Sequence, residues 1–206
     1  MPTPFPFLGN PLLDSIDCKD LPRKDRLQMQ RQALHSLLRR TFAPYSSSEP
    51  ILSHHPGGAP HLPQYPHLSI SLSHSTTAVA ALIVERPSQC GIDVEDIRPP
   101  ALRLLPKFAT PEEINQVQSA PYPLIAASLL WSAKESLYKL FRPSTANLIQ
   151  SYRLQLPTAI NPFVSATSTG ELRFFVTLPE AIRAQEITVH IESRGESLFT
   201  WAIATP

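Results

Sequence analysis

Residues 68–95, LSISLSHSTTAVAALIVERPSQCGIDVE, hold three strand candidates in quick succession. Residues 68–73 and 78–84 are runs typical of strands, and they lie on either side of a polar turn, so they indicate a hairpin. Residues 91–95 form a short third strand. This stretch predicts a small antiparallel sheet.

Two long helices are predicted, one before and one after this sheet. Residues 21–42 carry leucines near one face and several arginines on another, and residues 124–142 show the same apolar repeat. Further strand candidates follow the second helix, at 149–156, 171–178, 187–193 and 198–204. A helix followed by a hairpin therefore occurs twice. We expect an α+β fold of two similar, pseudo-symmetric halves, residues 1–98 and 99–206, each a long helix packed on a small antiparallel sheet.

Composition excludes several classes of protein. The 206 residues include 18 basic and 17 acidic side chains, so nothing global favours nucleic acid or an anionic membrane as a partner. Two isolated cysteines predict a reducing compartment. Because the proline-broken amino terminus lacks a signal-peptide pattern and no apolar run reaches about 18 residues, we expect a cytoplasmic protein with no membrane span.

Two carboxylates alternate with apolar residues in Gly91-Ile92-Asp93-Val94-Glu95. A strand would place Asp93 and Glu95 on one face, about 7 Å apart. Paired carboxylates suit Mg²⁺, which keeps coordination places for water and substrate phosphate. The alternative is an ordinary exposed strand face, which the motif alone does not exclude.

The segment Trp131-Ser-Ala-Lys-Glu-Ser-Leu-Tyr-Lys139 lies in the second helix. Helical spacing puts Glu135 and Lys139 on neighbouring turns of one face, with Lys134 on an adjacent face. Glu135 is a candidate third Mg²⁺ ligand and the lysines are candidate phosphate contacts, whereas the alternative is a surface ion pair.

Ser73-His74-Ser75 lies where the first strand turns. A serine hydrolase is disfavoured, because adjacent strand residues point to opposite faces and no G-x-S-x-G motif is present. Binding of an anionic ligand and an ordinary polar turn both remain open. The histidines at 54, 55, 61 and 67 match no familiar zinc spacing, and neither a P-loop nor a G-x-G-x-x-G motif occurs.

In this order, Ser73-His74-Ser75, residues 91–95, Phe108-Ala-Thr-Pro-Glu-Glu113 and residues 131–139 resemble the phosphopantetheinyl transferase family, and most closely its single-chain, two-halved surfactin-type and enterobactin-type members. The resemblance spans about residues 21–142. It implies an active site between the two halves.

The resemblance also implies roles for individual residues. Asp93, Glu95 and Glu135 would hold Mg²⁺, and Glu135, Lys139 and Glu113 would be catalytic, with Glu112 as the alternative to Glu113. The residues implied to bind coenzyme A are Arg23, Lys24, Arg31, Ser73, His74, Lys134 and Lys139. One departure is Gly58-Ala59-Pro60, where the family often has Gly-Lys-Pro.

The implied reaction is Mg²⁺-dependent transfer of phosphopantetheine from coenzyme A to a serine of an apo acyl or peptidyl carrier protein, with release of adenosine 3′,5′-bisphosphate. Because both halves lie in one chain, we expect a monomer. Two alternatives are a non-catalytic relative that binds coenzyme A or a carrier protein, and a phosphohydrolase that uses the same acidic residues.

Overall fold

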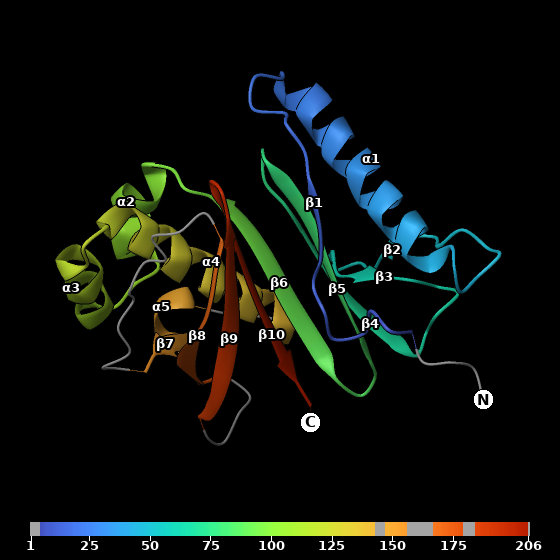
Figure 1. The fold of residues 1–206 in the computed structure, drawn as a ribbon. Helices are drawn as coiled ribbons and strands as arrows, with labels where there is room; N and C mark the ends of the chain where they lie inside the picture. The colour runs from blue at the N-terminus through green and yellow to red at the C-terminus, as the bar shows by residue number, and fades with distance from the viewer. Residues whose placement is uncertain (1–4, 143–146, 156–166, 179–183, 206) are drawn as a thin grey trace.

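The computed structural model describes residues 5–142, 147–155, 167–178 and 184–205. Its first part is a helix lying along a three-stranded antiparallel sheet of order β1-β5-β4 (Figure 1). The elements are α1 (Arg23–Phe42), β1 (Leu12–Ser15), β4 (Leu68–His74) and β5 (Ala78–Glu85). Leu34, Leu38 and Phe42 of α1 are buried in one cluster with Ile70 and Ile83 of the sheet, which confirms the apolar face predicted for this helix.

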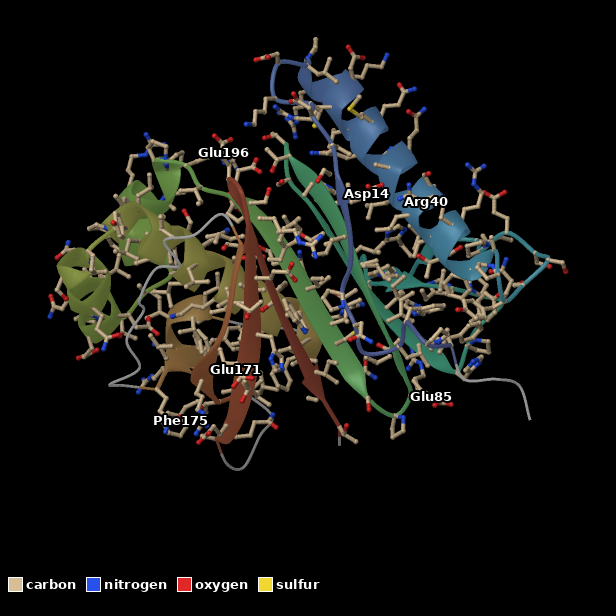
Figure 2. The ribbon with its side chains drawn as sticks, in the orientation of Figure 1. Asp14, Arg40, Glu85, Glu171, Phe175 and Glu196 are labelled. Atoms are coloured by element: carbon tan, nitrogen blue, oxygen red, sulfur yellow. The ribbon has the colours of Figure 1, made fainter. Side chains whose placement is uncertain are left out.

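Strand β1 lies in the proline-broken amino terminus, where the sequence analysis predicted no helix or strand. It pairs with β5 from Leu12 opposite Ala81 to Ser15 opposite Ala78. Asp14 on this strand accepts a hydrogen bond of 2.6 Å from Arg40 on α1, and Figure 2 shows the two side chains close together. The proline-rich segment at 43–67 holds a further small ribbon, in which β2 (Ser53–His54) pairs with β3 (Pro60–His61).

The second part packs α4 (Pro123–Phe141) against a five-stranded antiparallel sheet of order β6-β10-β9-β8-β7, behind which the helix lies in Figure 1. The strands are β6 (Gln89–Asp96), β7 (Tyr152–Leu154), β8 (Thr167–Val176), β9 (Gln185–Arg194) and β10 (Ser197–Ala204). The predicted α+β class is confirmed. Both long helices and most predicted strands are also found, with bounds shifted by a few residues.

One predicted strand, 149–156, is wrong in its first part. The Asn147 side chain accepts hydrogen bonds from the backbone N–H groups of Ile149 and Gln150 and so caps a short helix, α5 (Leu148–Ser151). Only then does β7 begin. Residue 156 of the predicted strand lies outside the described residues.

Three short helical elements lie between β6 and α4. They are α2 (Pro100–Leu104), the 3₁₀ helix η1 (Leu105–Lys107) and α3 (Pro111–Ser119). Thr110 and Glu113 cap α3 reciprocally, the Thr110 hydroxyl accepting from the Glu113 N–H and the Glu113 carboxylate accepting from the Thr110 N–H. The sequence analysis named this motif but did not predict a helix from it.

Strand β6 connects the two parts. Its backbone pairs with β10, yet the N–H groups of Ile92 and Val94 donate to the hydroxyls of Ser71 and Ser73 on β4, each at 3.1 Å. These serines thus satisfy buried backbone donors where no strand pairing does so. The proposed boundary after residue 98 stays a prediction. None of the described helices has the length and apolar content to cross a membrane.

Candidate functional site

A pocket of about 720 Å³ lies where α1, the β2–β3 ribbon, β4, β6 and α4 meet. This volume falls within the range of small-molecule sites. Of the sequence-predicted site residues, seven line it: Arg31, Ser73, His74, Asp93, Glu95, Glu135 and Lys139. Segments that lie far apart in the sequence therefore meet at one cavity.

Asp93 is the most constrained side chain of the pocket. Its Oδ1 accepts from the Lys139 ammonium at 2.8 Å and from the Ser73 hydroxyl at 2.9 Å, and its Oδ2 accepts from the Ser132 hydroxyl at 2.9 Å. Lys139 also donates to Ser73 at 2.9 Å. These groups form one hydrogen-bonded cluster from β4, β6 and α4.

Glu95 and Glu135 complete the acidic wall of the pocket. Burial raises the pKa of both carboxyls, and the negative charge of Asp93 raises them further. Arg98 opposes this shift at Glu95, to which it donates at 2.8 Å, and Lys139 opposes it at Glu135. A wall of three carboxylates at this burial attracts positive charge.

The rest of the pocket lining includes imidazoles and one guanidinium. Burial lowers the pKa of His74, and the nearby positive charges of Lys139 and Arg31 lower it further. Two more histidines line the same pocket, His35 and His54. The sequence analysis missed both. His35 had a usable signal, because it lies one helical turn after Arg31, whereas His54 lies in the proline-rich segment and only the β2–β3 pairing brings it to the pocket.

Lys134 and Glu113 do not lie at this pocket. Both are buried, with Lys134 donating to Glu113 at 2.6 Å and to the carbonyl oxygen of Phe108 at 2.8 Å. The other Glu113 oxygen accepts from the Leu154 N–H. Lys134 has no exposed surface, so in this structure it has no access to a substrate phosphate. Glu113 is the buried acid of the motif and Glu112 is exposed.

Two of the residues implied to bind coenzyme A lie away from this pocket. Arg23 and Lys24 lie at the exposed start of α1 and are not among the pocket residues, whereas Arg31 is two turns further along. Gly58 and Pro60 do line the pocket. Ala59 between them offers no charged group there.

The metal site predicted from the sequence is not preformed. Across residues 5–142, 147–155, 167–178 and 184–205, no three His, Cys, Asp or Glu side chains are grouped closely enough to hold a metal ion. Lys139 is paired with Asp93 and Arg98 with Glu95. The cations next to these carboxylates are thus supplied by the chain itself.

A mixed α+β fold whose pocket is lined by three carboxylates, a lysine and an arginine fits the class of enzymes that transfer phosphorylated groups. The family model of the 4′-phosphopantetheinyl transferase superfamily matches residues 89–191. Enterobactin synthase component D of Salmonella typhimurium is 35% identical over 96% of this chain and 87% of its own length, and that of Salmonella typhi is 30% identical with the same coverage. A 4′-phosphopantetheinyl transferase of Bacillus subtilis is 28% identical over 48% of this chain and 44% of its own.

The chain belongs to the 4′-phosphopantetheinyl transferase superfamily. Its enzyme class is accordingly that of a phosphopantetheinyl transferase. Nothing in the comparisons favours the alternatives of a non-catalytic relative or a phosphohydrolase.

Proposed function

We propose that this protein transfers phosphopantetheine from coenzyme A to a serine of an apo acyl or peptidyl carrier protein and releases adenosine 3′,5′-bisphosphate. The observation that carries the proposal is the single pocket in which Asp93, Glu135, Lys139 and His74 meet in a member of this superfamily. Its volume and its lining, which holds three carboxylates together with Arg31 and Lys139, suit a nucleotide substrate that carries several phosphates and binds with a cation.

Mg²⁺ is the proposed metal, with Asp93, Glu95 and Glu135 as its ligands. Three observations support this donor set: the carboxylates share one wall, each has hard oxygen donors, and two have a pKa raised by burial and by their neighbours' negative charge. When bound, Mg²⁺ would neutralise charge on the diphosphate of coenzyme A.

The chain's own residues would then act on the reacting atoms. The carrier serine oxygen forms a bond to the β-phosphorus, and the bond from that phosphorus to the bridging oxygen breaks. The bridging oxygen leaves with adenosine 3′,5′-bisphosphate. Glu135 accepts the serine proton, and Lys139, whose ammonium reaches the pocket, donates to phosphate oxygens.

Glu113 and Lys134 have a different role in this proposal. Their buried pair connects α3, the Phe108 carbonyl and the end of β7 to α4, the helix that carries Glu135 and Lys139. We assign the pair to the position of α4, with no contact to the substrate. Removing one partner of a buried ion pair leaves an uncompensated charge, which destabilises the fold by about 3–5 kcal/mol.

The carrier protein is proposed to approach over α2 and η1. Arg98, Arg103 and Lys107 are exposed on this segment, next to a hollow of about 210 Å³ that shares Glu95 and Trp131 with the main pocket. Since carrier proteins are usually acidic, positive charge here complements them. We expect the protein to act as a monomer.

The test is intact-mass spectrometry of several apo carrier proteins incubated with the enzyme, coenzyme A and Mg²⁺. We expect a mass gain of one phosphopantetheine, together with one adenosine 3′,5′-bisphosphate per modified carrier. EDTA, or replacement of the carrier serine by alanine, should abolish both. Release of adenosine 3′,5′-bisphosphate without any gain in carrier mass would support the phosphohydrolase instead and contradict the proposal.

A further inference from the structure

Two buried hydroxyl groups lie in series behind Asp93, and the first of them bonds its carboxylate. Ser132 on α4 donates to Asp93 Oδ2 at 2.9 Å, and Thr200 on β10 lies 2.9 Å from the Ser132 oxygen. Thr200 is the register partner of Asp93 in the pairing of β10 with β6. Ser132 and Thr200 have no exposed surface.

The direction of these hydrogen bonds follows from the number of protons. A serine hydroxyl has one proton, and Ser132 uses it on the carboxylate, which cannot donate when ionised. The contact between the two hydroxyls must then be donated by Thr200. Thr200 therefore donates to Ser132, and Ser132 donates to Asp93. If either hydroxyl rotated away from its acceptor, a buried polar group would be left unpaired.

The two oxygens of Asp93 differ in their partners. Oδ1 is shared by Ser73 and Lys139, which line the pocket, and Lys139 also donates to Ser73. For Oδ2, the described residues offer one donor, Ser132. The orientation of the carboxylate plane therefore depends on Ser132.

We propose that Ser132 and Thr200 are positioning residues that orient the Asp93 carboxylate for binding a divalent cation. This inference rests on the proposed function, because it takes Asp93 to be a cation ligand. Carboxylates that bind metals are commonly hydrogen-bonded from behind, and loss of such a partner weakens metal binding by about 10- to 100-fold.

Direct measurement of Mn²⁺ binding tests the inference without any turnover. Titration followed by electron paramagnetic resonance, in the presence of coenzyme A, gives the Mn²⁺ dissociation constant of each variant. We expect Ser132→Ala to bind Mn²⁺ at least about tenfold more weakly than the unchanged protein.

Ser136→Ala is the matched control. Ser136 is also fully buried on α4, but its hydroxyl donates to the Ala133 carbonyl oxygen within the helix and has no contact with Asp93. This variant should bind Mn²⁺ as tightly as the unchanged protein. An equal loss in both serine variants would show a general effect on α4 and overturn the inference.

Thr200 provides a second pair of variants in case Ser132→Ala does not fold. Thr200→Val has the same shape without the hydroxyl and should weaken Mn²⁺ binding, whereas Thr200→Ser keeps the hydroxyl and should restore it. Unchanged binding in Thr200→Val and Ser132→Ala would overturn the inference, as would a protein that binds no Mn²⁺ at all. The carrier mass assay decides separately whether the proposed function holds.

Discussion

Close approach between β6 and α4 depends on one glycine in the Gly-x-Asp-x-Glu stretch. A Cβ atom placed on Gly91 would lie 1.9 Å from the Ser136 carbonyl oxygen and 2.6 Å from the Leu140 nitrogen, both backbone atoms of α4. Backbone cannot move aside as a flexible side chain can. Gly91 thus lets the strand that carries Asp93 pack directly on the helix that carries Glu135 and Lys139.

Gly91→Ala should destabilise the fold by about 3 kcal/mol, because the added methyl group overpacks this contact. The free energy of unfolding from urea titration measures the change. Gly57→Ala is the matched control, since nothing lies within 4 Å of a Cβ at that position. Equal stability of the two variants would contradict the close approach.

The two cysteines are free and buried thiols. Burial raises the pKa of Cys90 to about 12 and also raises that of Cys18. Since only the thiolate reacts quickly with alkylating reagents, both should resist iodoacetamide at pH 8 in the folded protein and react once it is unfolded. Mass spectrometry after timed labelling provides the measurement, and rapid labelling of Cys90 in the folded protein would contradict its burial.

Helix α1 and the β2–β3 ribbon contribute histidines to the pocket that were not identified from the sequence. Ala59 stands where the resemblance implied a lysine, and His54 is paired in register with the neighbouring Pro60. His54, together with His35 and Arg31, gives the pocket hydrogen-bond donors for an anionic ligand.

Replacing His35 and His54 together by alanine should raise KM for coenzyme A by at least about tenfold, because even one hydrogen bond to a charged group contributes about 1.5–3 kcal/mol. The value of kcat should change little. Steady-state kinetics over a range of coenzyme A concentrations gives both numbers. His55→Ala is the control, since His55 is in the same segment but does not line the pocket; an unchanged KM in the double variant would remove these histidines from the binding site.

The exposed charges on α2 and η1 should affect binding of the carrier protein and not binding of coenzyme A. Reversal of Arg103 and Lys107 to glutamate is expected to raise KM for the carrier several-fold and to leave KM for coenzyme A unchanged. The effect should shrink at high salt. Arg39→Glu, an exposed charge on α1 outside the pocket, is the control, and an equal effect there would indicate only a change in net charge.

At the scale of the whole molecule, periodicity was enough to predict the long elements. Helices α1 and α4 and strands β4, β5, β9 and β10 have clear apolar repeats. The short helices α2 and α3 have too few apolar positions for such a pattern, and they form through proline at their first turns and the Thr110 cap. Strand β1 depends on pairing with β5, a long-range contact that local sequence does not encode.

Local sequence patterns predicted some residues of the site and missed others. Asp93 and Glu95 follow from alternation along a strand, and Glu135 and Lys139 from the spacing of a helix. The family resemblance implied a phosphate contact for Lys134. One residue in a helix is a rotation of about 100°, however, and the Lys134 side chain, next to Glu135 in the sequence, lies in the core beside Glu113. The hydroxyls of Ser132 and Thr200 come together only in three dimensions.

The central claim is that the pocket lined by α1, β4, β6 and α4 is the site of phosphopantetheinyl transfer. Asp93 is the residue on which this claim depends most. The most direct measurement is the rate of carrier modification by Asp93→Ala, followed by intact mass. Arg39→Ala, at an exposed position of α1 outside the pocket, serves as the folded control. We predict a loss of at least about a hundredfold for Asp93→Ala, because the variant removes both the proposed metal ligand and the partner of Lys139. Transfer at an undiminished rate in Asp93→Ala would contradict the account.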